Sequence, residues 1–182
     1  MGSRCPVGPE TFDNAMNMLF SHLPPRPVAL SLCETFFEQA SWLSQPIKQD
    51  ELIQDILTPV YMAKERRENA QSTMATHVSP HKLSIMFSVF AMAILKDLTL
   101  PAFNEEGERH HHCARAALAL RTVFDSPTID TVQAITFMTI YCSSSVHRYT
   151  RDSVWMLASL GCKLAQSVSA FFPVPGCSLI LR

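Results

Sequence analysis

Apolar residues recur along this chain at the three- and four-residue steps that are typical of helices, and no segment alternates as a strand does. Prolines separate the apolar segments, and a helix usually ends before a proline. The pattern predicts helices over residues 11–23, 28–43, 48–57, 82–98, 110–124, 128–142 and 154–168. It therefore predicts an all-α fold, an irregular helical bundle of about six or seven helices.

The segment over residues 82–98 is predicted to be the most buried helix. Phe87 and Phe90 share one face with other large apolar residues, while Met86 and Val89 make further faces apolar. A helix that is apolar on several sides needs neighbours all round it. We therefore expect this segment at the centre of the bundle.

Other segments are assigned by the same reasoning. Trp42 and Trp155 occur at helical spacing, where aromatic residues are mostly part of a core, so we expect both in the core. Residues 61–77 are polar, and the mixed charges between Lys64 and Arg67 indicate a solvated helix end or a loop.

The last two predicted helices form a hairpin. Pro127 and Thr128 supply a preset backbone angle and a capping hydroxyl, so a helix should begin near Thr128. In the following segment, residues 154–168, the apolar stripe includes the small residues Ala158 and Gly161. Small residues allow another helix to approach closely, so we expect the two helices to pack antiparallel.

Two runs in this hairpin carry a longer pattern, TVQAI followed by a helix that reads YTRDSVWMLASLGCKLAQS. This arrangement resembles the signature region of the fungal-specific transcription factor domain, the middle homology region of fungal zinc-cluster regulators. The matching residues are Thr131, Val132, Gln133, Ala134, Ile135, Tyr149, Ser153, Trp155, Met156, Leu157, Leu160, Lys163, Leu164, Ala165, Gln166 and Ser167. Residues 31–61 and 110–127 resemble upstream blocks of that family in the expected order, so the resemblance covers about three quarters of the chain.

The resemblance implies a non-catalytic domain that regulates DNA-templated transcription in the nucleus through contacts with protein partners. In full-length members of the family, a separate N-terminal segment of closely spaced cysteines holds zinc and binds DNA. The six cysteines here are widely scattered: Cys5, Cys33, Cys113, Cys142, Cys162 and Cys177. We therefore expect no zinc or other cofactor in this chain, and DNA binding only through a cluster that it lacks.

The sequence predicts three segments. Residues 1–27 are expected to form a disordered start and a short helix, residues 28–168 part of the regulatory domain, and residues 169–182 an atypical apolar tail. Members of the family continue past the KLAQS helix into a turn and further helices, whereas here the chain soon reaches Pro173. We therefore expect an incomplete domain.

Composition narrows the classes of function. Of 182 residues, 47% are hydrophobic and 17% are charged, and the formal net charge is −1. A chain whose net charge is slightly negative is a poor binder of nucleic acid by itself. The longest apolar run, residues 83–95, is shorter than the ~20 residues that span a bilayer, so we expect no membrane span.

One group of residues suggests a metal site. His110 and Cys113 lie three apart, so they share a helix face, but zinc needs three or four ligands. A zinc site would form only if the fold brought His77, His81 or His147 near to them. We expect instead that the histidines at residues 110–112 lie partly exposed at a helix start, that Cys113 packs inward, and that no metal is bound.

Catalytic motifs are missing from the sequence. It contains no GxSxG, Walker or GxGxxG pattern, so we expect no catalytic or cofactor-binding residue and no enzymatic activity. The leading hypothesis is a regulatory domain of a fungal zinc-cluster transcription factor. The alternative is a helical protein–protein interaction or dimerisation scaffold, and a truncated, non-functional product is a further alternative.

Overall fold

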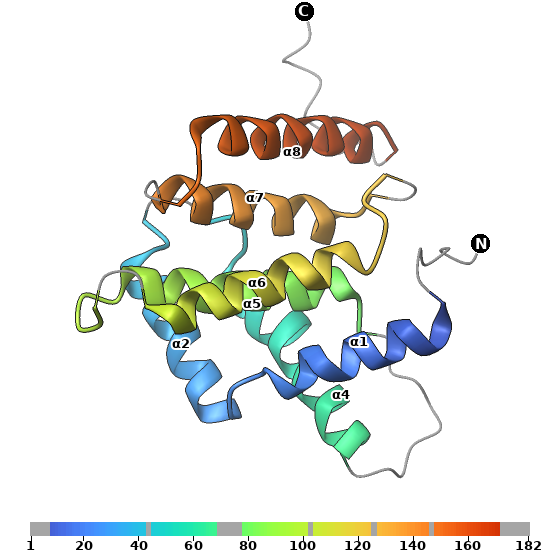
Figure 1. Ribbon diagram of the computed structural model, residues 1–182, viewed down its shortest axis with the longest axis vertical. Coiled ribbons are helices and arrows are strands. Elements are labelled where there is room, and N and C mark those ends of the chain that lie inside the picture. The colour runs from blue at the N-terminus through green and yellow to red at the C-terminus, as the bar shows by residue number, and fades with distance from the viewer. Residues whose placement is uncertain are drawn as a thin grey trace, which may run out of the picture.

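The computed structural model describes residues 8–42, 45–68, 78–101, 104–124, 127–145 and 148–171. Within these residues every regular element is a helix, which confirms the all-α prediction. The elements are α1 (Pro9–Ser21), α2 (Arg26–Gln39), α3 (Gln49–Glu51), the π-helix η1 (Leu52–Leu57), α4 (Thr58–Glu68), α5 (Pro80–Lys96), α6 (Glu105–Ala119), α7 (Ile129–Ser144) and α8 (Arg151–Phe171). Figure 1 shows them in layers, with α8 outermost, α7 beneath it, then α5 and α6, and α1, α2 and α4 on the far side.

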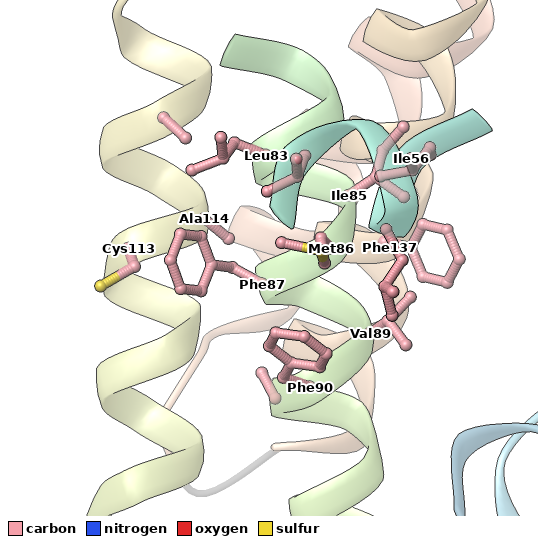
Figure 2. Close-up of a cluster of buried hydrophobic side chains, with 14 of the residues drawn as sticks. Ile56, Leu83, Ile85, Met86, Phe87, Val89, Phe90, Cys113, Ala114 and Phe137 are labelled. Atoms are coloured by element: carbon pink, nitrogen blue, oxygen red, sulfur yellow. The ribbon is translucent and has the colours of Figure 1, made fainter. Parts of the chain in front are cut away.

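The helix α5 lies at the centre of the bundle, as predicted. It packs against α2, α6 and α7, and every residue from 83 to 94 is buried. Figure 2 shows Phe87 between α5 and α6, and Ile85 near Ile56 of η1. The helix ends two residues before the predicted boundary, because Asp97 adopts an extended conformation. Leu98 is consequently outside the helix and 95% exposed.

The segment around Pro59 corrects the sequence prediction. A helix was expected to end near residue 57, before Pro59, and residues 61–77 were expected to form a solvated helix end or a loop. The second expectation holds for residues 65–68, an exposed helix end, and residues 69–77 lie outside the described residues. The first expectation does not hold. Instead α3, η1 and α4 follow one another without a break from residue 49 to 68, and Val60 and Tyr61 are buried. Pro59 cannot donate to the Asp55 carbonyl four residues earlier, but the Lys82 ammonium of α5 donates to that oxygen at 3.1 Å. The wider π-helical turn precedes the proline, which is a recognised way of accommodating local strain.

The charged end of α4 anchors α1. The Arg67 guanidinium donates to the Asn17 side-chain oxygen at 2.5 Å and lies 4.9 Å from the centre of the Phe20 ring. The Tyr61 hydroxyl donates to the Pro24 carbonyl at 2.5 Å, just beyond α1. These contacts give the mixed charges of residues 64–67 a structural role.

The hairpin of α7 and α8 forms as the sequence predicts. Thr128 caps α7 in a reciprocal capping box with Thr131, so the helix begins where expected. The helix α8 runs antiparallel along α7 (Figure 1), with Leu164 and Val168 buried. A methyl group added at Gly161 would lie 3.4 Å from Ile135, which shows how closely the helices approach.

Two large side chains of α8 are exposed. Trp155 is 72% exposed and Met156 is 74% exposed. Trp42, at the end of α2, is 78% exposed, and its indole N–H donates to the Gln39 carbonyl. The prediction that Trp42 and Trp155 belong to the core was therefore wrong, because neither residue has a helix packed over it.

Two further predictions concern the membrane and the chain ends. Within the described residues, no helix combines the length and the apolar character needed to cross a membrane. The first helix begins at Pro9, two residues before the predicted start, and α8 runs to Phe171, three residues into the predicted tail over residues 169–182. Residues 1–7 and 172–182 lie outside the described residues.

Candidate functional site

Three polar residues of α6 lie on the face that meets the turn between α7 and α8. Glu108, His111 and Arg115 are spaced three and four residues apart, so they follow one another along one side of the helix. Glu108 forms an ion pair with Arg148 in the turn. Arg115 lies within hydrogen-bonding reach of the Tyr149 hydroxyl. Side chains of α6 therefore hold the turn of the hairpin in place.

His111 is the centre of this contact. Its side chain is 1% exposed, and its ring stacks on Tyr141 of α7 with the centroids 4.2 Å apart and the planes at 14°. The Tyr149 ring meets it edge-on, at 5.5 Å and 73°. Neither ring nitrogen of His111 has a hydrogen-bond partner among the described residues. Aromatic contacts, rather than hydrogen bonds, thus fix this imidazole between α6 and the hairpin.

A cavity of about 270 Å³ lies where α6, α7 and α8 meet, and we call it the junction cavity. His111 and Arg115 of α6 and Met138 and Cys142 of α7 form one part of its wall. The turn and α8 contribute Tyr149, Ser153, Met156 and Leu157. The fold thus brings side chains from three helices to one small space.

Burial keeps most ionisable groups of the junction cavity uncharged near neutral pH. It lowers the pKa of His111 to about 4, and the charge of Arg115 adds to this effect. It raises the pKa of the Cys142 thiol to about 11 and also raises the pKa of Tyr149. Among the described residues of the wall, Arg115 alone carries a charge, because arginine stays protonated in proteins.

The chemistry of the junction cavity follows from these properties. A protonated thiol such as Cys142 is a weak nucleophile, and an imidazole with so low a pKa is a weak base at neutral pH. Arg115, by contrast, presents a forked set of donors that suits a carboxylate. The wall is therefore better suited to recognising an anionic group than to proton transfer or nucleophilic attack.

The histidine and cysteine cluster that suggested a metal is divided by the fold. His110 is 5% exposed and packs between rings of α5, with centroids 5.8 Å from Phe87 and 5.6 Å from Phe90. His81 is buried elsewhere, where its Nδ1 lies 2.9 Å from the Thr131 hydroxyl.

No group of three potential ligands forms among the described residues, and His77 and His147 lie outside them. The expectation that residues 110–112 lie partly exposed at a helix start is wrong in its position for all three histidines, and only His112 is exposed. The helix begins at Glu105, which places His110 and His111 in its middle, where both are buried. Cys113 packs inward as expected, with 9% of its surface exposed.

A larger cleft of about 560 Å³ lies between α1 and α6. Met18 and Leu19 form its apolar wall on α1, and His112 and Cys113 lie opposite on α6. Charged residues of both signs complete the lining, including Glu105 and Arg109. Because both positive and negative side chains line this cleft, its wall does not favour a ligand of one charge as the wall of the junction cavity does.

Comparison with protein-family models, with curated proteins and with solved structures found no match for this chain. The site must therefore be interpreted from its own geometry.

Sequence reasoning singled out His110 and Cys113 on α6 and passed over Glu108, His111 and Arg115. Their spacing was a usable signal, because polar residues three and four apart lie on one side of a helix and can join one polar contact. What the sequence alone did not indicate is that this row meets Tyr149, which lies more than thirty residues further along the chain.

Proposed function

We propose that this chain is a non-catalytic regulatory domain of a fungal zinc-cluster transcription factor, which controls DNA-templated transcription in the nucleus. In this proposal, zinc and DNA are bound by the N-terminal cysteine cluster of full-length relatives. The present chain contributes contacts with protein partners or with an effector. It carries out no chemical step.

One observation carries the proposal. Four residues of the pattern that resembles the family, Tyr149, Ser153, Met156 and Leu157, lie in the wall of the junction cavity. Residues that serve only to join two helices need not gather around one cavity with an arginine and a buried histidine from a third helix. Their arrangement supports a shared role in sensing or in transmitting a conformational change.

The position of the hairpin offers a mechanism. The helix α8 packs mainly on α7, and α6 meets the hairpin turn through His111, Arg115 and the Glu108–Arg148 ion pair. A ligand or partner that binds one arrangement of the hairpin more tightly than another shifts the population between them. The two arrangements would present different surfaces of α8 to the transcription machinery.

The uncharged state of the buried groups supports the non-catalytic part of the proposal. Burial opposes both protonation of His111 and ionisation of Cys142 near neutral pH. Acid–base or thiol catalysis in the junction cavity would need one of these groups in its reactive form.

A reporter experiment tests the proposal. The full chain is placed between an unrelated DNA-binding domain and an activation segment, and reporter output is compared with that of a flexible linker of the same length. We expect the chain to change the output. The variant Tyr149→Ala should reduce this change, because it removes the ring that contacts His111. Trp42→Ala is the matched control, since Trp42 is exposed at the end of α2. Equal output from the chain and the linker would contradict the proposal.

A second candidate function is a dimerisation scaffold that binds another copy of this chain through α8. The observation that favours it is the large exposed side chain of Trp155 on α8, with the exposed Met156 beside it. Sedimentation across a range of concentrations tests it. A discrete dimer that is lost in Trp155→Ala would support this function, whereas a monomer at all concentrations would rule it out and aggregates of mixed size would indicate an incomplete domain.

A further inference from the structure

We propose that the junction cavity binds a small aromatic carboxylic acid, whose carboxylate pairs with Arg115. This inference deepens the proposed function, on which it rests, because it names the class of effector that would act on the hairpin. The binding itself is argued from the wall of the cavity in three steps.

The first step concerns charge. Arg115 is the one charged side chain among the described residues of the wall, and no acidic residue lies beside it there. The nearest acidic residue of the same row on α6, Glu108, is already paired with Arg148. A guanidinium forms two parallel hydrogen bonds with a carboxylate, and the hydroxyls of Ser153 and Tyr149 lie in the same wall. The site therefore favours a ligand that carries one carboxylate.

The second step concerns the body of the ligand. Met138, Met156 and Leu157 form the apolar part of the wall. The sulfur atoms of methionines make favourable contacts with aromatic rings. The phenol ring of Tyr149, which is only partly buried, adds a flat surface on which another ring can stack or pack edge-on. These side chains together suit an aromatic group better than a sugar or a polar chain.

The third step concerns size and the buried imidazole. A volume of about 270 Å³ equals that of about nine water molecules in the liquid. This space suits one six-membered ring with a short acidic side chain. His111 is 1% exposed, so its imidazole bounds this space but offers a ligand almost no surface.

Methyl NMR of the full chain, with labelled methionines, tests the proposal directly. Phenylacetate, 4-hydroxyphenylacetate and benzoate are each added at millimolar concentration. We expect at least one acid to shift the methyl signals of Met138 and Met156 in a saturable way. Met18, in the cleft between α1 and α6, and Met62, on α4, serve as internal controls and should not move. Phenylacetamide, which has the same shape without the charge, should bind at least about tenfold more weakly.

Two variants of α6 complete the test. Arg115→Gln should weaken binding of the acid by about tenfold or more, because it removes the charged donor. Arg109→Gln should leave binding unchanged, since Arg109 lies on the same helix but in the wall of the other cleft. Circular dichroism checks that both variants are folded.

Several outcomes would overturn the assignment. Signals of Met138 and Met156 that do not move with any acid, equal binding of the acid and the amide, or shifts confined to Met18 would each do so. The reporter experiment is scored separately. Loss of the regulatory effect with intact binding would contradict only the proposed function, and a regulatory effect without binding would contradict only the ligand assignment.

Discussion

The imidazole of His111 lies flat against the phenol ring of Tyr141, with the ring centroids 4.2 Å apart. This contact joins α6 to α7 beside the junction cavity, and it depends on a histidine that stays neutral. The same holds for His110, which packs against Phe87 on the other side of α6. The stability of the bundle should therefore depend on the protonation of both residues.

The first prediction concerns pH. Burial lowers the pKa of His110 and His111 from 6.5 to about 4, so the unfolded chain binds protons more readily than the folded one between these values. The free energy of unfolding should fall as the pH is lowered from about 6.5 to 4. Below pH 4, both states bind these protons, so the two histidines should cause no further fall. Each histidine accounts for up to about 3 kcal/mol of the loss. Urea titrations at several pH values measure it.

The variant His111→Phe keeps a ring against Tyr141 and removes the titrating nitrogens, so its loss of stability over this pH range should be smaller than that of the wild type. The exposed His112 provides the control, and His112→Phe should retain the wild-type slope. An unchanged slope in His111→Phe would show that this imidazole is not the group responsible.

The second prediction compares two glycines. A methyl group at Gly161 would lie 3.4 Å from Ile135, an ordinary contact, whereas one at Gly107 would lie 3.2 Å from Ile94 and require that side chain to move. Gly161→Ala should therefore stabilise the protein by up to about 1 kcal/mol through the helix preference of alanine. Gly107→Ala should gain less or lose stability. Thermal unfolding measures both, and the reverse order would show that α8 packs differently on α7.

The third prediction concerns Pro59. The Lys82 ammonium donates to the Asp55 carbonyl at 3.1 Å, at the position where the proline supplies no N–H. Lys82→Met should destabilise the protein by about 1 kcal/mol. The loss should be smaller when Pro59 is replaced by alanine, which restores a donor. Lys163→Met, on the exposed side of α8, is the control and should have little effect. Equal losses with and without Pro59 would mean that the two features are not coupled.

The fourth prediction concerns thiol reactivity. Burial raises the pKa of Cys33 to about 12 and that of Cys142 to about 11, so both thiols stay protonated, whereas Cys162 is exposed. In a background with Cys5 and Cys177 replaced by serine, iodoacetamide should label Cys162 rapidly in the folded protein. Cys33 and Cys142 should react only after unfolding, which mass spectrometry of the labelled peptides can follow. Rapid labelling of Cys142 in the native state would indicate that the hairpin opens readily.

The position of a helix could be predicted from the sequence where local capping signals and the apolar pattern indicate the same element. The start of α7 at Thr128 was predictable because a capping hydroxyl and a preceding proline act within a few residues. The burial of α5 was predictable because its apolar residues leave no face for solvent. The hairpin was predictable because two such patterns are separated by a short polar break.

The remaining features depend on distant parts of the chain. The helix continues through Pro59, and the Asp55 carbonyl, to which the proline cannot donate, accepts from Lys82 of another helix. The exposure of Trp42 and Trp155 could not be predicted, since spacing gives the face of a helix but not whether another helix covers it. The junction cavity likewise forms only when three helices are in place. Of its surroundings, the sequence alone shows only the row of Glu108, His111 and Arg115.

The one-sided packing of α8 has a consequence for the order in which the molecule opens. A helix with one principal neighbour loses few buried contacts when it detaches, so its backbone amides should exchange with deuterium at a lower free energy than those of α5. The protection pattern should fall from the innermost layer to the outermost one. The helix α8 would thus detach and return many times for each unfolding of the whole protein.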